Sequence, residues 1–354
     1  MGNGTRQVIV GGLAVGGGAP VSVQSMLCAP PEDVQANIAQ ATQLEEAGCQ
    51  LIRVAAPDKG GVKLIPAIKA AVSIPLVADI HFDYKLALES VAAGADGIRL
   101  NPGNIGGEDR VKQVALACRA KGIPIRVGVN AGSLEKEILA RHSGPTPQAL
   151  VESALGQAAL LERFDFADIA LSLKCSDVKT TVEAYRLAAQ TCDYPLHIGV
   201  TEAGTPRIGT IKSSIGIGSL LLDGIGDTLR VSLTGDPVEE VRVGLGILQA
   251  LGMGSGVNVI SCPTCGRCKI DLISLTHAVE GAMANIPGPL TIAVMGCAVN
   301  GPGEAAHADL GVAGGDGEGL IFAEGKALEK VPQEKITERL TALAKQLTVG
   351  RYSH

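Results

Sequence analysis

Short apolar segments and longer amphipathic segments alternate along the first 250 residues of the chain. Eight apolar segments are rich in valine, isoleucine and leucine and show little alternation with polar residues, which is typical of parallel strands covered on both faces. The strands predicted in this way are residues 21–26, 50–56, 74–81, 97–103, 123–132, 168–176, 195–204 and 228–236.

The segments between these strands have the residue pattern of helices, for example residues 32–48, 108–122 and 146–164. Glycines stand where helices are expected to end, at Gly48, Gly94 and Gly122. An open doubly wound sheet is the alternative. In that fold a complete Gly-x-Gly-x-x-Gly turn is expected after the first strand, and the sequence has none. Eight strand–helix units in about 250 residues match a (β/α)8 barrel. We therefore predict an α/β protein with a TIM-type barrel over residues 1–250.

A different pattern follows the glycine-rich linker at 250–257. It predicts an initial strand, a helix over 270–286, a strand over 290–297, a glycine-rich segment and a polar helix over 333–347. We expect residues 257–354 to form a small α/β domain whose cysteines lie near strand ends or turns.

Composition narrows the class of ligand. The chain carries a formal net charge of -6 and has four tyrosines, four phenylalanines and no tryptophan, which argues against nucleic-acid binding. The sequence shows neither a secretory signal nor a convincing membrane span. Nine cysteines in such a chain indicate a reduced, cytoplasmic protein in which clustered thiols bind metal or take part in redox chemistry.

Cations occupy the predicted strands near their carboxyl ends, where barrel enzymes place their chemistry. These cations are Arg53, Arg99, Arg126, Lys174 and Arg230. Like charges repel one another unless an anion lies among them, and arginine suits bidentate contact with phosphate oxygens. We therefore predict a site for a phosphate or diphosphate ester at the barrel mouth. The alternative for any single cation is a structural ion pair.

Other polar residues stand at the same strand ends. The expected substrate contacts among them are Asp79, His81, Asn130, Thr201 and Ser232. The alternative for His81 is a structural group with a hydrogen-bond partner inside the protein. Glu202 precedes Gly204 in a loop and becomes a proton donor or acceptor if desolvation raises its pKa; the alternative is that it only balances an arginine. His197, inside "PLHIGV", is more consistent with packing than with function.

Three cysteines at two-residue intervals occur in "SCPTCGRCKID", residues 261–271. The spacing of Cys262, Cys265 and Cys268 is typical of an iron–sulfur site, and zinc is the alternative metal. The remaining cysteine of this domain, Cys297, stands in "GCAVNGPGEAAHADLG" among glycines and near Glu304. Small residues let backbone amides approach cluster sulfides, which favours iron and sulfide over zinc.

Six strings together closely resemble the bacterial 4-hydroxy-3-methylbut-2-enyl diphosphate synthase family, in order and over nearly the whole chain. These strings are "ADIHFDY", "RLNPGNIG", "RVGVNAGSLEK", "TEAG", "SCPTC" and "GCAVNGPGEA". The family holds one [4Fe–4S] cluster per chain with three cysteines and one glutamate. On this chain the resemblance implies Cys262, Cys265, Cys297 and Glu304 as ligands, and it makes Cys268, which spacing alone would have chosen, a bystander.

The resemblance also implies the reaction. 2-C-methyl-D-erythritol 2,4-cyclodiphosphate is reductively opened and dehydroxylated to (E)-4-hydroxy-3-methylbut-2-enyl diphosphate, in non-mevalonate isoprenoid biosynthesis, with electrons from reduced flavodoxin or ferredoxin. The family's diphosphate-binding positions correspond here to Arg53, Arg99, Arg126, Lys174 and Ser232, with Asn130 nearby, and its catalytic glutamate corresponds to Glu202.

Members of this family are homodimers in which the cluster domain of one subunit caps the barrel mouth of the other, so the resemblance implies the same for this chain. One departure is the loop "LCAPPEDV" after "VQSM", where the family usually continues with threonine and asparagine. Substrate contacts in that loop are therefore not implied.

Two other classes of protein fit part of the pattern. A phosphate-binding barrel such as a pterin-binding methyl transferase with a structural zinc would need no electron donor. A non-enzymatic iron–sulfur carrier would leave the cations and the glutamate at the strand ends unexplained.

Overall fold

The computed structural model describes residues 4–284, 286, 288–297 and 307–352 of the 354-residue chain. The chain divides into two compact units, Met1–Ile247 and Leu248–His354.

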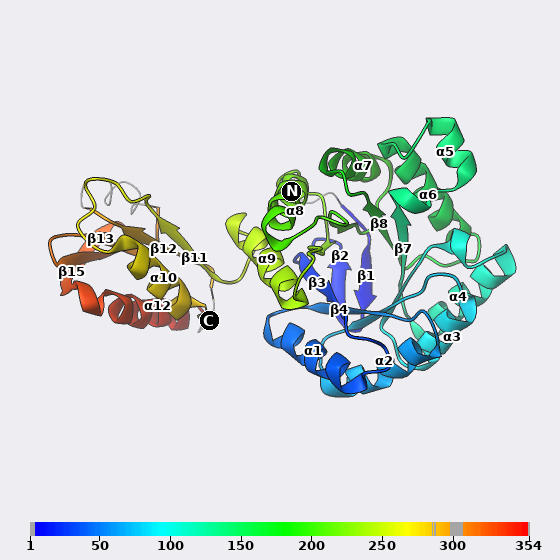
Figure 1. The fold of residues 1–354 in the computed structure, drawn as a ribbon, viewed down its shortest axis with the longest axis horizontal. Helices are drawn as coiled ribbons and strands as arrows, with labels where there is room; N and C mark the ends of the chain where they lie inside the picture. Colours follow the sequence, from blue (N-terminus) through cyan, green and yellow to red (C-terminus); the bar gives the residue numbers. More distant parts are fainter. Residues whose placement is uncertain (1–3, 285, 287, 298–306, 353–354) are drawn as a thin grey trace. The chain divides into compact units, whose positions relative to one another are not determined.

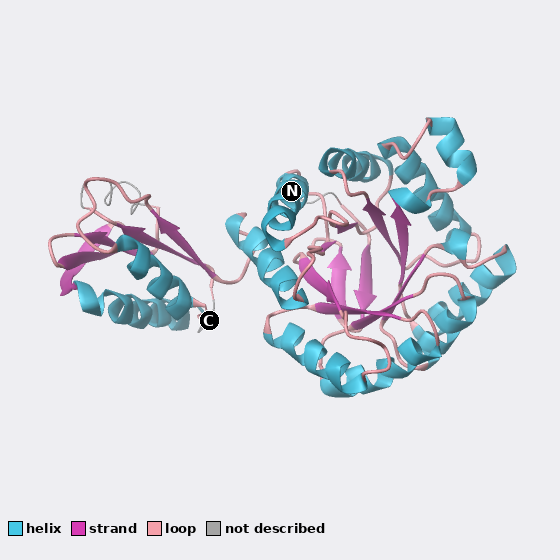
Figure 2. Ribbon diagram, viewed as in Figure 1, coloured by secondary structure: helices cyan, strands magenta, loops and turns pink. Residues whose placement is uncertain are grey.

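Eight parallel strands form a barrel in the first unit (Figures 1 and 2). They are β3 (Ser22–Met26), β4 (Leu51–Ala55), β5 (Leu76–Asp79), β6 (Gly97–Leu100), β7 (Ile125–Asn130), β8 (Ile169–Lys174), β9 (His197–Ile198) and β10 (Thr228–Leu229). Hydrogen bonds link them in the order β8-β7-β6-β5-β4-β3-β10-β9. A parallel bridge between Leu171 and Leu196 brings the two ends of this sheet together. The predicted (β/α)8 barrel is confirmed.

Helices surround the strands (Figure 2). They are α1 (Val34–Glu46), α2 (Lys59–Ala71), α3 (Tyr84–Ala92), α4 (Glu108–Lys121), α5 (Lys136–His142), α6 (Pro147–Glu162), α7 (Val178–Thr191), α8 (Pro206–Leu222) and α9 (Pro237–Ala250), with short 3-10 turns at Pro102–Asn104 and Ala131–Ser133. Aspartates cap several of them, as Asp33 does by accepting from the Ala36 N–H at 2.9 Å. Gly122 ends α4 at a φ of 64°, a left-handed conformation that favours glycine.

An N-terminal hairpin, β1 (Gln7–Val10) and β2 (Leu13–Gly16), was not predicted. Its valines, among them Val8, pack against Leu51 and Val77, which lie in the first half of β4 and β5. The hairpin therefore covers the amino end of the barrel and leaves the carboxyl end open for a site. The signal was the two-glycine turn between two short apolar runs.

In its described residues, the second unit contains a five-stranded sheet and the helices α10 (Leu272–Met283) and α12 (Ile336–Tyr352). Its strands are β11 (Val257–Ser261), β12 (Leu290–Met295), β13 (Leu310–Gly314), β14 (Glu318–Ala323) and β15 (Lys326–Pro332). The first three are parallel, and β13, β14 and β15 pair antiparallel. Helices α10 and α12, the latter preceded by a 3-10 turn at Gln333–Lys335, share an apolar core with the sheet.

The small α/β domain is confirmed, and the described part of the glycine-rich segment, for which no element was predicted, contains strands β13 and β14. Glycines such as Gly311 and Gly319 stand inside its strands because large side chains lie close above them. A Cβ atom on Gly311 would lie 2.4 Å from Phe322, and one on Gly319 would lie 2.6 Å from Val312. Among the described residues, no helix is long and apolar enough to cross a membrane.

Candidate active site

Buried cations meet inside the barrel, where Lys174 ends β8 and Arg126 is the second residue of β7. Arg53, Arg126 and Lys174 are 8%, 7% and 7% exposed, respectively. Arg126 on β7 reaches across the barrel to β3, where its Nη1 donates to Gln24 Oε1 at 2.8 Å. The register pairs Arg99 with Arg126, so successive strands bring their cations to similar heights. The predicted gathering of cations is therefore present.

Asp79 at the end of β5 is the carboxylate that two of these cations share. Its Oδ1 lies 3.1 Å from Arg99 Nη1 and its Oδ2 lies 3.6 Å from Arg53 Nε. Burial opposes ionisation, but Arg53 and Arg99 outweigh burial and hold the pKa of Asp79 below its usual value. Asp79 is therefore an ionised partner within the cluster. His81 lies at its edge, with Nε2 3.9 Å from Asp79 and a half-exposed side chain.

Lys174 and Arg126 have no carboxylate partner in the described part of the chain, and Arg53 donates to a weak acceptor. Burial and then Arg53 and Arg230 lower the pKa of Lys174 well below its ordinary value, and no hydrogen bond or ion pair joins its Nζ to an acceptor in the described ranges. Burial lowers the pKa of Arg53 to about 10, and its Nη2 lies 2.8 Å from the weakly accepting thioether of Met26. Arg126 Nε and Nη2 have no partner among the described residues.

Within the described residues, the cations of this cluster outnumber its carboxylates. Five cations, Arg53, Arg99, Arg126, Lys174 and Arg230, are gathered with two carboxylates, Asp79 and Glu240. Such an excess of buried positive charge is unfavourable unless an anion enters. A ligand with two or more negative charges therefore complements the barrel mouth.

The other predicted contacts lie around this cluster. Asn130 ends β7 in register with Lys174, and both Thr201 and Ser232 are half-buried in the loops after β9 and β10. His197 is fully buried inside the barrel, and burial lowers the pKa of its imidazole well below the usual value. A neutral, packed His197 agrees with the expectation from the sequence.

Glu202 stands in the loop after β9 in a left-handed backbone conformation, with a φ of 52°. This conformation is unfavourable for residues other than glycine and is found more often at functional sites. The side chain is exposed, and no ion pair joins it to an arginine within the described part of the chain. The alternative role of balancing a neighbouring arginine is therefore not seen in this structure.

In the second unit, Cys262 and Cys297 follow the neighbouring parallel strands β11 and β12, and Ser261 is in register with Val294. The two thiols therefore come from the same edge of the sheet. The Gly296 N–H points at Cys262 Sγ over 3.3 Å, the kind of amide–sulfur contact that iron–sulfur sites use. Cys297 is buried. Glu304 lies outside the described residues.

The two cysteines between these strands differ from each other. Cys265 is exposed, and hydrogen bonds from Arg267 lower the pKa of its thiol, which favours the thiolate that metals bind. Cys268 instead donates its thiol proton to the Ile270 carbonyl at 3.2 Å and packs against the core. The described side chains do not include three histidine, cysteine, aspartate or glutamate groups close enough to hold a metal. The ligand set thus stays a prediction.

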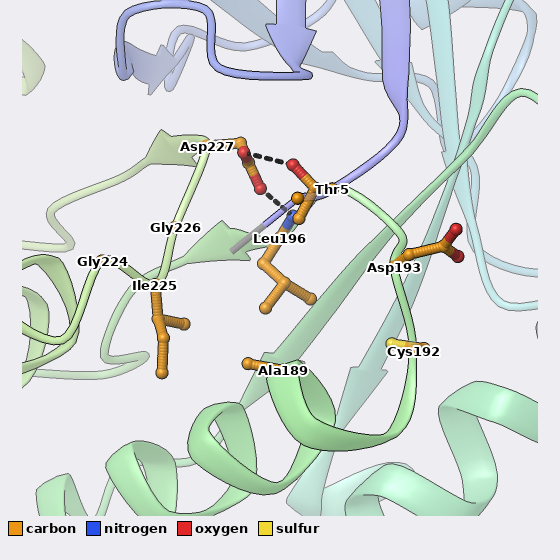
Figure 3. Close-up of a pocket in the computed structure, with 10 residues that line it drawn as sticks. Thr5, Ala189, Cys192, Asp193, Leu196, Gly224, Ile225, Gly226 and Asp227 are labelled. Atoms are coloured by element: carbon orange, nitrogen blue, oxygen red, sulfur yellow. Dashed lines mark hydrogen bonds between the residues drawn. The ribbon is translucent and has the colours of Figure 1, made fainter. Parts of the chain in front are cut away.

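A separate cavity of about 190 Å³ lies beside the segments that precede β9 and β10 (Figure 3). Asp227 in its wall accepts from Thr5 Oγ1 at 2.9 Å and from the Leu196 N–H at 2.8 Å, as the dashed lines in Figure 3 mark. Its walls contain none of the predicted site residues. Because it lies at the amino end of these strands, it is distinct from the cation cluster.

Comparison with known proteins decides the family. The family model described as the GcpE TIM-barrel domain matches residues 5–245, and that of the GcpE protein C-terminal domain matches residues 258–346. The chain belongs to the GcpE family. The resemblance found in the sequence is thereby confirmed.

Several curated relatives in the GcpE family are similar to this chain over almost their full length. A 4-hydroxy-3-methylbut-2-en-1-yl diphosphate synthase (flavodoxin) of Caldanaerobacter subterraneus is 58% identical over 337 residues, which is 95% of each chain. The enzyme of the same name from Geobacter sulfurreducens is 55% identical over 349 residues and covers 98% of this chain and 99% of its own.

Solved structures add only the fold. A 3-dehydroquinate dehydratase from Geobacillus kaustophilus superposes with a TM-score of 0.50 at 15% identity and covers 71% of this chain and 99% of its own. At that identity the similarity supports the barrel of this GcpE family member and says nothing about its substrate.

Sequence reasoning missed two polar residues of the GcpE barrel, Gln24 and Glu240. Both are buried and both hold a cation of the cluster, Arg126 and Arg230, respectively. The only signal for Gln24 was a polar residue inside the apolar strand "VSVQSM". Glu240 is preceded by a second glutamate, Glu239, and the pattern does not tell which of the two faces the barrel.

Proposed function

We propose that this chain reduces 2-C-methyl-D-erythritol 2,4-cyclodiphosphate to (E)-4-hydroxy-3-methylbut-2-enyl diphosphate. The ring opens between carbon and a phosphate oxygen, one hydroxyl oxygen leaves as water, and two electrons are consumed. Family membership and the names of relatives that align over nearly the whole chain support this enzyme class.

The observation that carries the proposal is the excess of buried cations over carboxylates at the barrel mouth. Lys174 has four arginines around it and no anion bonded to its Nζ in the described ranges. A cyclic diphosphate supplies the missing negative charge in one rigid ligand, and arginine and lysine are the side chains suited to phosphate oxygens. We assign diphosphate binding to Arg53, Arg99, Arg126, Lys174 and Ser232, with Asn130 nearby.

We call these diphosphate-binding residues the cradle. Asp79 orients two of them, Arg53 and Arg99, because each of its oxygens faces one guanidinium group. Bound between Arg53 and Arg99, it keeps their side chains extended into the barrel before the substrate arrives. We assign His81 and Thr201 to the rim of the site, where they contact the less charged part of the substrate.

Glu202 is assigned to proton transfer. Its carboxyl group has no ion-pair partner in the described ranges and stands on a strained loop at the carboxyl end of β9. A proton delivered to the departing hydroxyl oxygen turns a poor leaving group into water.

The thiols fit a [4Fe–4S] cluster. Cys262, Cys265 and Cys297 supply thiolate donors, glycine stands beside them, and a backbone amide already points at one sulfur. We assign one cluster per chain to these cysteines and Glu304, in a domain formed by residues 257–354. When bound, the cluster supplies the electrons, and its carboxylate-ligated iron has the most exchangeable position. Reduced flavodoxin is the expected donor, as the names of the relatives indicate, with ferredoxin as the alternative.

We also propose a homodimer in which one subunit's cluster domain caps the other's barrel. An exposed apolar stripe on α8 supports association of two barrels. Its residues Ile208, Ile211, Ile215 and Leu222 are 47%, 51%, 55% and 76% exposed. Their spacing is that of a helix–helix seam. An antiparallel second copy centred on Ile215 would set Ile208 against Leu222.

The charges at the two ends of α8 agree with this arrangement. Arg207 precedes the stripe and Asp223 follows it, at equal distances in sequence from Ile215. An antiparallel pair therefore brings each arginine towards the opposite aspartate, which also pairs with Arg186 of its own chain.

The cysteine-rich composition supports a reducing compartment, for which we propose the cytoplasm.

The experiment that tests the function is an anaerobic turnover assay of the reconstituted protein with the cyclic diphosphate and chemically reduced flavodoxin. The expected result is formation of the allylic diphosphate, together with about four iron atoms per chain by metal analysis. A zinc-containing, colourless protein that leaves the substrate unchanged would overturn the proposal.

A further inference from the structure

Glu240 is a buried carboxylate to which the proposed reaction assigns no role. It lies in the first turn of α9 and is 4% exposed. Its neighbour Glu239 is half-buried and forms an ion pair with Arg242 on the same helix. Burying a carboxylate is unfavourable unless charged and polar partners replace its water. The partners of Glu240 therefore show what it holds.

Two segments of the barrel, β3 and the loop after β10, converge on this carboxylate. Ser25 Oγ on β3 donates to Oε2 at 3.0 Å, and the Leu233 N–H in the loop after β10 donates to Oε1 at 3.0 Å. Arg230, directly after β10, donates from Nε and Nη2 over 3.3 Å. Both oxygens are engaged from different directions, so the side chain has one orientation.

The loop that these bonds hold carries a proposed substrate contact. Ser232 lies between Arg230 and Leu233, the two residues of this loop that Glu240 binds. A serine hydroxyl reaches a phosphate oxygen only if its backbone is held, because the side chain is short. Glu240 thereby sets the position of Ser232 without reaching the ligand itself.

The same loop is joined to the loop of the proposed proton donor. The Thr234 N–H donates to the Gly204 carbonyl at 2.9 Å, two residues beyond Glu202. Leu233 also packs closely on Gly209 of α8. A Cβ atom added to Gly209 would lie 2.6 Å from Leu233 Cδ2. The β10 loop is thus bonded to the segment that holds Glu202.

We propose that Glu240 is a positioning residue for the diphosphate: it fixes Arg230 directly, Ser232 through the flanking Leu233 N–H, and Glu202 through the Thr234–Gly204 hydrogen bond. The Glu240 carboxylate also offsets the positive charge of Arg230, and the ion pair holds the Arg230 side chain in one position beside the diphosphate-binding residues. This inference rests on the proposed function.

The test compares Glu240→Gln with Glu239→Gln in the cluster-loaded protein. Without reductant the cyclic diphosphate is not consumed, so its Kd is measured by calorimetry, and kcat is then measured with reduced flavodoxin. Glu240→Gln keeps the shape of the side chain but loses its charge. We expect its Kd to rise about tenfold, equivalent to ~1.4 kcal/mol, and kcat to fall, with unchanged iron content. Glu239→Gln is expected to match wild type.

A second variant keeps the test informative if Glu240→Gln does not fold. Ser25→Ala removes one hydrogen bond to the carboxylate and leaves the charge, and we expect Kd to rise about threefold. A purely structural Glu240 predicts a lower Tm in the variants with wild-type Kd and kcat, and that result overturns the inference. Wild-type protein that neither binds nor turns over the cyclic diphosphate overturns the proposed function instead.

Discussion

Arg126 spans the barrel from β7 to reach Gln24 on β3, with 2.8 Å between Nη1 and Oε1. The two residues are 102 positions apart in the sequence. This contact leaves two other guanidinium nitrogens of Arg126 without a partner among the described residues. A buried guanidinium held at one nitrogen, with further donors to offer, is arranged for a ligand that only the folded barrel can surround.

Arg126 is therefore expected to be a binding residue that lowers stability. Burial and the neighbouring Arg53 and Arg99 lower its pKa well below the ordinary value, which means that its charge is unfavourable in the empty barrel. In Arg126→Met we expect the Kd for the cyclic diphosphate to rise at least 100-fold, while the Tm of the ligand-free protein stays equal or rises. Calorimetry and thermal unfolding measure the two effects.

The matched control is Arg119→Met on α4, whose guanidinium is half-exposed and lies 4.0 Å from Asp165. A surface pair of this kind contributes little to stability, so Kd and Tm are expected to match wild type. An unaltered Kd in Arg126→Met would remove this residue from the cradle.

Lys174 makes stability depend on pH in a defined direction. Burial and then Arg53 lower its pKa well below the unfolded value of 10.5. Between the folded and unfolded pKa values the unfolded chain binds more protons, so the free energy of unfolding rises with pH across that window. We expect this slope, measured by denaturant titration of ligand-free protein from neutral pH to pH 10, to be smaller in Lys174→Met.

Inorganic pyrophosphate provides the complementary measurement. An anion beside Lys174 favours the protonated amine, so binding is expected to take up protons, which calorimetry in buffers of different ionisation enthalpy detects. Lys112→Met, on the exposed face of α4, is the control and keeps both the slope and the proton uptake. Equal slopes in wild type and Lys174→Met would contradict the assignment.

The sequence predicts those site residues that stand in a local pattern. It does not predict pairs of residues that are far apart in the sequence. Arg53, Arg99, Arg126 and Lys174 were predicted because each stands in an apolar strand, a local pattern, and the barrel topology then brings the strand ends together. Glu240 and Ser25 are 215 positions apart and Gln24 and Arg126 are 102 apart, so their pairing arises only from the closed sheet. Strand β13 was missed because its two glycines, Gly311 and Gly314, interrupt its apolar residues.

The cysteines of "SCPTCGRCKID" are expected to divide into ligands and a bystander. Cys268 donates its thiol proton to a carbonyl and packs in the core, whereas Cys265 is exposed with a lowered thiol pKa. We expect Cys268→Ser to retain its full iron content. It should also keep the absorption at roughly 410 nm that is typical of iron–sulfur charge transfer. Cys265→Ser is expected to lose the cluster.

Glu304→Ala completes this set, with weaker cluster retention and no turnover as the expected results. Iron analysis, visible spectra and the anaerobic assay are measured on the same preparations, with Cys28→Ser in the exposed loop after β3 as the control. Loss of one iron per cluster in Cys268→Ser, with full activity in Glu304→Ala, would reverse the ligand assignment.

Glu202 is expected to affect turnover and leave binding unchanged. Its side chain is exposed and has no ion pair within the described ranges, so Glu202→Gln removes a proton donor without disturbing packing. We expect kcat to fall by about 100-fold, the lower range for loss of a general acid, with Kd, iron content and Tm at wild-type values. Glu137→Gln, exposed on α5, serves as the control. A wild-type kcat in Glu202→Gln would exclude the proton-transfer role.

The apolar stripe of α8 predicts how two barrels associate. Ile215 lies at its centre and is 55% exposed, so a lysine there would carry a charge into the seam between two copies and meet its own counterpart across the two-fold axis. We expect Ile215→Lys to shift the mass measured by sedimentation equilibrium from dimer to monomer without lowering Tm. Leu116→Lys, at a partly exposed apolar position on α4, tests whether any added surface charge has this effect, and we expect it to remain dimeric. A dimer that persists in Ile215→Lys would move the interface to another face of the barrel, because a buried, like-charged pair at the centre of the α8 seam is incompatible with stable association.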